Sequence, residues 1–230
     1  MKILAVSDTE LDMIYSPMIT QRFRDVDLVI GCGDLPYYYL EYIISMLNRT
    51  TYFVRGNHAP RFKEEGVGGE RTHPWGAIDL HRRVVRDSSG LLLAGIEGSL
   101  NYNNGRYQYS QEEMWAMILA MVPRLLLNRI LYGRYLDIFV THAPPWQIHD
   151  KEDLPHQGIK AFRWLIEKFK PTYHLHGHIH IYQQYDITET DHQGTRVVNS
   201  YGYKTLQFAF EQGNKGIRHI PPEDDNLDEA

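Results

Sequence analysis

The feature that most constrains the fold is a series of three short apolar segments near the N-terminus, separated by helical patterns. Residues 2–8, 27–34 and 50–58 read as buried strands that end in polar residues. Residues 16–25 and 35–47, which lie between them, have patterns typical of helices. This β-α-β-α-β order predicts a parallel sheet, and ligands bind such sheets beyond the carboxyl ends of their strands.

The remaining segments continue this alternation. Further strands are expected at residues 90–99, 136–145 and 172–178, with short β segments up to about residue 210. Helices are expected at residues 110–121 and 157–169. The patterns predict one α/β domain over residues 1–215, followed by an acidic tail, residues 216–230, that is expected to be disordered.

The composition is that of one globular domain with a sizeable core. The chain has 230 residues, of which 43% are hydrophobic and 23% are charged. The formal charge of −5 argues against nucleic acid as a partner, because nucleic-acid-binding surfaces are usually basic. Cys32 is the only cysteine, so no disulfide can form within the chain, and we expect it to be a small buried residue rather than a nucleophile.

No association with a membrane is expected. The N-terminus begins at once as a strand, without the apolar stretch and cleavage site of a signal peptide. The most apolar segment, residues 114–131, is interrupted by Pro123 and Arg124 and is predicted to be too short and too interrupted to span a bilayer. Pro123 should also kink or end the helix that contains it. We therefore expect a soluble cytoplasmic protein.

Residues 174–180, with the sequence HLHGHIH, place four histidines at alternate positions. A continuous strand would turn all four imidazoles to one face. Gly177 interrupts this pattern, because glycine within a strand pattern often marks an ending or a close approach of the backbone. The segment alone therefore leaves open whether these histidines bind a metal or pack in the core.

Candidate ligands follow five of the predicted strands. In chain order these elements are Asp8-x-Glu10, Gly33-Asp34, Gly56-Asn57-His58, Thr141-His142 and Gly177-His178-x-His180. Each element alone has an ordinary explanation, since aspartate often caps a helix and asparagine stabilises turns. Five such elements at five strand ends are hard to treat as independent accidents, and they predict one shared site.

The order and spacing of these elements resemble the signature of the calcineurin-like metallophosphoesterase family, and the resemblance extends from Lys2 to about Phe210. It implies an α/β fold, a four-layer αββα sandwich, with two divalent metal ions held at the strand ends. Carried over position by position, the ligands of the first ion would be Asp8, Asp34, His180 and the residue at position 10. Those of the second ion would be Asp34, which bridges the two, with Asn57, His142 and His178.

The same resemblance separates the four histidines of the HLHGHIH segment. His178 and His180, after Gly177, match ligand positions. His174 and His176 match none, so we expect them to pack in the core or to orient a ligand through a hydrogen bond.

The activity that the resemblance implies is that of a dinuclear metal-dependent phosphoesterase, a phosphodiesterase or phosphatase acting on a small phosphate ester. Two ions about 4 Å apart stabilise the attacking and leaving oxygens of an in-line displacement and activate the attacking water. Asp34 and Asn57 would take part in catalysis as ligands. His58 would meet the substrate and protonate the departing alkoxide, which suits a phosphodiester slightly better than a phosphomonoester.

Two positions depart from the family pattern. The first motif is usually Asp-x-His, and Glu10 stands in place of its histidine. As a ligand, Glu10 would favour hard ions, Mn²⁺ or iron rather than Zn²⁺; otherwise the first site is weak or empty. We favour ligation, because residues 8 and 10 share a face if the strand continues. Ala59 stands where the family often has a carboxylate, so the protonation of His58 at neutral pH is less assured.

Neighbouring residues have weaker claims. Arg55 would either bind a phosphate oxygen of the substrate or form a structural ion pair. His156 would either touch the substrate or be a solvated loop histidine. The apolar segment after residue 110 would cover the pocket, form the contact of a homo-oligomer, or simply pack in the core.

Two further functions are weighed against the enzyme. The first is a catalytically impaired scaffold that retains the fold and one metal, which Glu10 and Ala59 favour mildly. The second is a nuclease, since relatives use the same motifs on DNA, but the acidic charge and the lack of a basic run argue against it.

Overall fold

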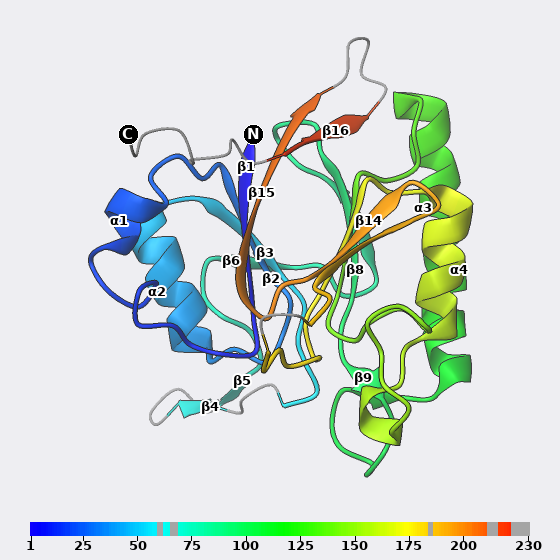
Figure 1. Ribbon diagram of the computed structural model, residues 1–230, viewed down its shortest axis with the longest axis horizontal. Helices are drawn as coiled ribbons and strands as arrows, with labels where there is room; N and C mark the ends of the chain where they lie inside the picture. Colours follow the sequence, from blue (N-terminus) through cyan, green and yellow to red (C-terminus); the bar gives the residue numbers. More distant parts are fainter. Residues whose placement is uncertain (59–61, 65–68, 184–185, 211–215, 222–230) are drawn as a thin grey trace.

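The computed structural model describes residues 1–58, 62–64, 69–183, 186–210 and 216–221. Two six-stranded sheets dominate the chain (Figure 1). The first sheet has the order β16 (Ile217–Ile220), β15 (Gly202–Phe210), β1 (Lys2–Ser7), β2 (Leu28–Gly31), β3 (Thr50–Phe53) and β6 (Ala77–Asp79). The second has the order β13 (Glu189–His192), β14 (Thr195–Asn199), β12 (Tyr173–His176), β11 (Ile138–Thr141), β8 (Leu92–Ile96) and β7 (Arg83–Arg86).

Helices cover the outer face of each sheet. Helices α1 (Ile19–Arg22) and α2 (Tyr37–Leu47) share a hydrophobic cluster with the first sheet. Helices α3 (Gln111–Tyr132) and α4 (Lys160–Phe169) share another with the second sheet. A third cluster joins the facing sides of the two sheets. The order of layers is therefore helix, sheet, sheet, helix, and the expected αββα sandwich is confirmed (Figure 1).

The strands that lead to the candidate ligands run in parallel. Strands β1, β2 and β3 are parallel neighbours in the first sheet, and β8, β11 and β12 are parallel neighbours in the second. The parallel β-α-β-α-β unit predicted for the first 58 residues is thus confirmed, although α1 is only one turn long. Smaller elements complete the chain: β4 (Phe62–Glu64) with β5 (Gly69–Arg71), β9 (Ser99–Leu100) with β10 (Gln108–Tyr109), and a 3₁₀ turn, η1 (Leu154–His156).

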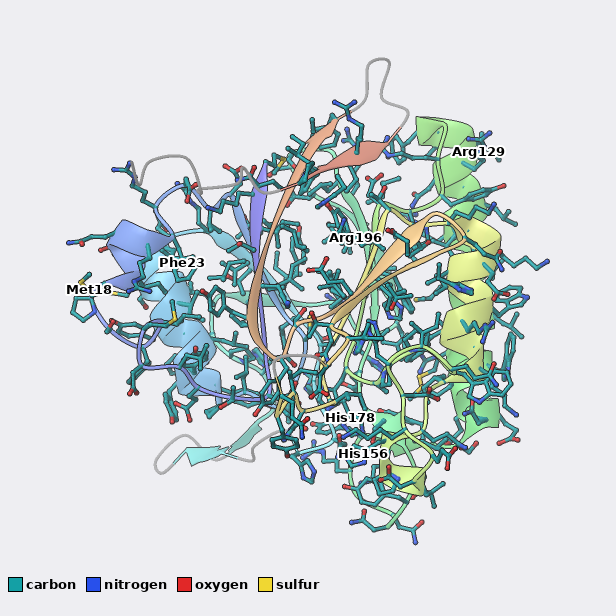
Figure 2. The ribbon with its side chains drawn as sticks, viewed as in Figure 1. Met18, Phe23, Arg129, His156, His178 and Arg196 are labelled. Carbon is teal, nitrogen blue, oxygen red and sulfur yellow. The ribbon has the colours of Figure 1, made fainter. Side chains whose placement is uncertain are left out.

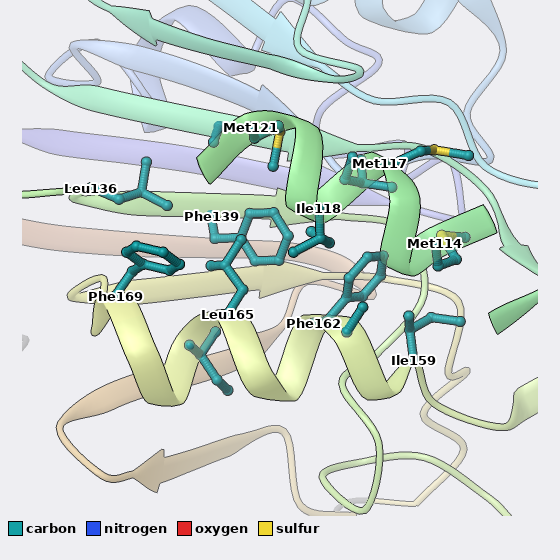
Figure 3. Packing of buried hydrophobic residues seen from close by; sticks show 14 of the residues in the cluster. Met114, Met117, Ile118, Met121, Leu136, Phe139, Ile159, Phe162, Leu165 and Phe169 are labelled. Atoms are coloured by element: carbon teal, nitrogen blue, oxygen red, sulfur yellow. The ribbon is translucent and has the colours of Figure 1, made fainter. Parts of the chain in front are cut away.

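Helix α3 continues past Pro123, where the sequence predicted a kink or an end. It begins with a capping box between Ser110 and Glu113 and continues for 22 residues to Gly133, whose φ of 74° closes it. Proline inside a helix removes one hydrogen bond and costs about 3 kcal/mol. Buried side chains on both sides of Pro123, among them Met121 and Leu125, pack against α4 and the second sheet and offset that cost. Figure 3 shows the part of this cluster around Ile118 and Phe162.

The expectation that the most apolar segment is too short and too interrupted to span a bilayer is wrong, because α3 is longer than predicted. By length and composition alone this helix could cross a bilayer, since its mean hydropathy is 1.5 over 18 residues, of which 33% are buried in the fold. The buried side packs in the core described above, and core helices pass the same test. The other side exposes large apolar residues: Leu119, Leu126, Leu127, Ile130 and Leu131.

The folded part of the chain extends beyond the expected boundary at residue 215. Strand β16 pairs antiparallel with β15 at the edge of the first sheet, up to Ile220. The rest of the acidic tail, residues 222–230, lies outside the described residues, so its predicted disorder stays a prediction.

Two histidines of the HLHGHIH segment lie in the core. His174 and His176 are fully buried on β12. His174 Nε2 lies 2.8 Å from the Thr141 hydroxyl, and His176 hydrogen bonds to the Gly177 carbonyl and to His149. Burial lowers the pKa of His174 to about 3, so its imidazole is neutral in the folded protein.

The neutral state of His174 predicts a loss of stability in acid. Its pKa in the folded protein lies below the value of about 6.5 in the unfolded chain, so stability is complete above pH 6.5 and falls as the pH decreases toward 3. Between pH 7 and pH 5 this group should lower the free energy of unfolding by about 2 kcal/mol. Urea unfolding of His174→Leu should show a correspondingly smaller decrease. His192→Leu, on edge strand β13, is the control, and an unchanged decrease in His174→Leu would contradict the assignment.

Candidate metal centre

The expected metal ligands lie at the carboxyl ends of strands from both sheets. Asp8 directly follows β1, and His142 directly follows β11. The segments after β2, β3 and β12 carry the other strand-end ligands: Asp34, Asn57, His178 and His180. His178 lies in the lower part of the molecule in Figure 2, just above His156.

Four of the expected ligands meet at the buried imidazole of His142. Its Nε2 lies 3.1 Å from Asp34 Oδ2, 3.0 Å from Asn57 Oδ1 and 3.1 Å from His178 Nδ1. The ligand atoms of Asp34, His142 and His178 all lie within 4.8 Å of one another. His142 Nδ1 lies 2.9 Å from the carbonyl oxygen of Cys32. Donation to this carbonyl fixes the ring and directs Nε2 into the site.

Asp8 and His180 lie beside each other next to this group. The Asp8 carboxylate accepts the backbone N–H of His178 at 2.9 Å and the hydroxyl of Ser7 at 2.5 Å. His180 Nε2 lies 3.8 Å from Asp8 Oδ1, and its ring packs on Tyr201 with the centroids 4.8 Å apart. The structure therefore brings together two of the residues expected to share the first ion.

Glycines precede the ligands because a side chain there would occupy the place of another ligand. A Cβ built at Gly33 would lie 2.5 Å from His142 Nδ1, and one at Gly56 would overlap the Asp34 carboxylate. The missing side chains let the backbone of each strand end approach the ligands on its neighbours. This gives the glycines of the sequence motifs a steric role.

Three of the expected ligands adopt the left-handed backbone conformation. The φ angle is 65° at Asp8, 51° at Asp34 and 68° at His178. This conformation is uncommon outside glycine, although aspartate adopts it more readily than most residues, and it costs of order 1–3 kcal/mol per residue. Such strain tends to gather at functional sites.

Burial and charge set the protonation of these groups in opposite directions. Burial opposes the ionised form of Asp34, but His142 next to it holds the pKa of this carboxyl below its usual value. Burial likewise disfavours a charged His142, yet Asp34 and Asp8 raise its pKa to about 9. Burial raises the pKa of Asp8 and lowers that of His178 to about 3. Two carboxylates thus share one cationic imidazole, and the site still favours additional positive charge.

The donor set fits divalent metal ions. Carboxylate oxygens, an amide oxygen and imidazole nitrogens converge on a buried edge, and this mixture suits Mn²⁺, iron or Zn²⁺. Asp34 has two oxygens, of which Oδ1 accepts the backbone N–H of His58 at 2.7 Å and Oδ2 faces His142. A carboxylate with an oxygen on each side is suited to bridge two ions.

Glu10 is held by a residue that the sequence did not connect with it. Both of its carboxylate oxygens accept the hydroxyl of Tyr38, at 2.8 and 2.7 Å, and both side chains are exposed. Tyr38 lies in the first turn of α2, directly after the Asp34 segment. Ligation by Glu10 stays a prediction, and Tyr38 is the group that fixes its carboxylate in this structure.

His58 lies at the exposed rim of the site, and Tyr102 faces it. The Tyr102 hydroxyl accepts a hydrogen bond from Asn57 Nδ2 at 3.1 Å and lies 3.5 Å from His58 Nε2. No pattern in the sequence pointed to Tyr102, which lies in a loop rich in tyrosine and asparagine. Ala59, expected to leave His58 without a carboxylate neighbour, lies outside the described residues.

The two residues with weaker claims lie in different surroundings. Arg55 Nη1 forms partly buried ion pairs with Asp79 at 2.7 Å and Glu97 at 2.8 Å, as the structural alternative expected. Binding of phosphate by Arg55 stays a prediction. His156 pairs with Asp153, and its ring centroid lies 5.4 Å from that of His178 (Figure 2). Only His156 of these two thus lies beside a ligand ring.

Cys32 is buried, as expected. Its thiol lies 3.9 Å from the Ser200 hydroxyl, and burial raises its pKa to about 12. A thiol this weakly acidic is not a nucleophile at neutral pH.

Comparison with known proteins identifies the family of the chain. The sequence model of the calcineurin-like phosphoesterase family matches residues 1–182, and the chain belongs to this family, whose members are generally metal-dependent phosphoesterases. No curated protein matches the sequence.

Solved structures share the fold at low sequence identity. One crystal structure superposes with a TM-score of 0.60 at 16% identity, over 89% of this chain and 94% of its own. TT1561 of Thermus thermophilus superposes with a TM-score of 0.55 at 16% identity, over 87% of this chain and 89% of its own. Vps29 from Entamoeba histolytica reaches a TM-score of 0.42 at 9% identity, over 96% and 98%, which is too distant to carry an argument. At these identities the likeness shows the fold alone.

The steric role of the glycines predicts the effect of a single methyl group. A Cβ at Gly177 would overlap Ser7 Oγ and Asp8 Oδ2, so Gly177→Ala must displace the Asp8 carboxylate. We expect this variant to lose about 1–3 kcal/mol of stability in urea unfolding and to bind Mn²⁺ more weakly in calorimetry. Gly194→Ala is the control for metal binding, because nothing lies within 4 Å of its Cβ position. Its φ of 91° makes this substitution cost stability by itself, so the two variants are compared in Mn²⁺ affinity, which Gly194→Ala should leave unchanged. Wild-type Mn²⁺ affinity in Gly177→Ala would show that the close approach is unimportant.

Proposed function

We propose that the protein is a dinuclear metal-dependent phosphoesterase that hydrolyses a small phosphodiester or phosphomonoester. The observation that carries this proposal is the convergence of Asp34, Asn57, His142 and His178 from both sheets, with Asp8 and His180 adjacent. Asp8, Asp34, His180 and Glu10 would hold one ion. Asp34, Asn57, His142 and His178 would hold the other.

Two divalent ions at this edge would activate water and stabilise the charge that develops on the phosphoryl oxygens. The chain supplies the remaining requirements. His58 lies at the open rim, where its ring can meet the leaving group and give it a proton. The Tyr102 hydroxyl, close to both Asn57 and His58, would orient these two side chains.

We further propose Mn²⁺ or iron as the native metals and the cytoplasm as the location. A site with three carboxylates prefers hard ions, which supports manganese or iron over zinc. In this proposal Tyr38 orients the Glu10 carboxylate toward the first ion, as partners outside the coordination sphere do in other metal sites.

The primary test is hydrolysis of bis-p-nitrophenyl phosphate by protein stripped of metal with EDTA, before and after addition of Mn²⁺. We expect activity only with Mn²⁺, and a loss of at least about 100-fold in His142→Ala, since His142 contacts three other expected ligands. His219→Ala, on edge strand β16, is the control and should retain activity. Equal activity in His142→Ala and the wild type would overturn the site.

The role of Glu10 has a separate test in metal content. We expect Glu10→Ala to lower the bound Mn²⁺ from about two ions per chain to about one, measured by elemental analysis after dialysis. Tyr38→Phe keeps the carboxylate but removes its partner, and we expect about tenfold weaker binding of the first ion. Full metal content in Glu10→Ala would exclude ligation by this residue.

The scaffold function is the second candidate, and the pairing of Glu10 with Tyr38 is the observation that favours it. A carboxylate held by Tyr38 alone would leave the first site weak, and one ion would then remain. Metal binding without turnover of either diesters or monoesters would support this candidate. A nuclease is disfavoured by the net charge of −5; a steep fall in substrate affinity with added salt would revive it.

A further inference from the structure

A cavity of about 670 Å³ opens next to His180. Its walls come from the segments that follow two expected ligands: residues 147–151 after His142, and residues 179–183 after His178. This volume is in the range of small-molecule binding sites. The cavity therefore borders the candidate metal centre at His180, which is expected to bind the first ion.

The surface that this cavity offers is mainly apolar. Ile148 and Ile179 are buried in its walls. Tyr182 and Ile187 lie at its mouth, where they are 76% and 70% exposed. Ile181, which follows His180 in the chain, is half-buried and also lines the cavity. Exposed apolar side chains around an apolar cavity are typical of a binding site.

The two carboxylates of the lining accept hydrogen bonds from backbone N–H groups. Asp150 Oδ2 accepts the N–H of Gly158 at 3.0 Å. Asp186 Oδ2 accepts the N–H groups of Tyr182 and Gln183 at 3.1 and 3.2 Å. These carboxylates therefore stabilise the loops that form the cavity and have less capacity for a ligand.

The histidines of the lining are engaged in the same way. Both ring nitrogens of His149 have partners, His176 at 2.8 Å and the Thr190 hydroxyl at 2.9 Å. Burial lowers the pKa of His149 to about 4, so its imidazole is neutral at neutral pH. The cation of the lining, Lys151, is exposed to solvent. His192 pairs with Glu167 outside the cavity. An apolar group is therefore the ligand that these walls suit best.

We propose that this cavity binds the organic group of the phosphate ester, and that this group is an alkyl chain or an aromatic ring without charge. The inference rests on the proposed function, because the phosphate would lie at the metal centre on one side of His180. Its ester group would extend past Ile181 into the cavity. The substrate class is then an apolar phosphate ester rather than a nucleotide or a sugar phosphate.

The test compares n-hexyl p-nitrophenyl phosphate with methyl p-nitrophenyl phosphate in the Mn²⁺-loaded protein. Both esters release p-nitrophenol, so their chemistry is matched and only the second ester group differs. We expect kcat/KM to be at least tenfold higher for the hexyl ester, since each buried methylene adds to binding. Equal values for the two esters would overturn the proposal.

Two variants test whether the preference for the hexyl ester arises in the cavity. Ile181→Asp should bring the ratio of kcat/KM for the hexyl and methyl esters to about one, because it places a charge on the path to the cavity. Ile130→Asp, at an isoleucine that is 80% exposed on α3, is the matched control and should retain the preference. A preference that survives Ile181→Asp would place the apolar subsite elsewhere.

Calorimetry distinguishes failure of this inference from failure of the proposed function. n-Hexylphosphonate should bind the Mn²⁺-loaded protein at least tenfold more tightly than methylphosphonate, whether or not the protein turns over esters. If neither ester is hydrolysed but this difference in affinity appears, the proposed activity fails and the cavity assignment stands. If the methyl ester is hydrolysed and the two phosphonates bind equally, the activity stands and the cavity assignment fails.

Discussion

Close approach of the backbone at the edge where the two sheets meet is the constraint on which the site depends. The expected ligands follow strands of different sheets. Their side chains can converge only if the residue before the ligand in a turn has no side chain of its own. Gly33, Gly56 and Gly177 meet this requirement, since a Cβ at each would fall on or beside another ligand or its support. The sandwich holds these turns in place through the cluster between the sheets.

The same turns carry a cost that the rest of the fold offsets. Asp8, Asp34 and His178 have left-handed backbones, and all three side chains are buried or nearly so beside groups of like or opposite charge. Neither feature stabilises an empty site. The stability that permits them comes from three hydrophobic clusters on both faces of each sheet.

Much of the fold followed from the sequence because its signals are local. Apolar runs with polar ends predicted the parallel strands, and glycine next to aspartate, asparagine or histidine predicted the shared site. Helix α3 was predicted too short, because the local effect of Pro123 was weighed without the packing of Met121 and Leu125 on the second sheet. Boundary errors of this kind arise when tertiary contacts outweigh a local preference.

The contacts that the sequence did not reveal come from loops. The contact of Tyr102 with His58 and that of Tyr38 with Glu10 form only because segments that are distant in the sequence lie side by side in the fold. Tyrosine has many other roles in proteins, so its presence alone predicted neither contact. The cavity beside His180 is likewise formed by two loops together, and the sequence does not show that they lie side by side. By contrast, the burial of His174 and His176 was expected from the resemblance, in which neither matches a ligand position, and both are fully buried on β12, before Gly177 interrupts the strand pattern.

The apolar outer side of α3 affects how the protein behaves in concentrated solution. Five leucine and isoleucine side chains face the solvent there, and nothing in the sandwich itself requires them to do so. Salts such as ammonium sulfate strengthen the burial of apolar surface, whereas urea weakens it. Aggregation at high protein concentration should therefore begin at this helix, and the choice of salt should govern its onset well before the fold itself is affected.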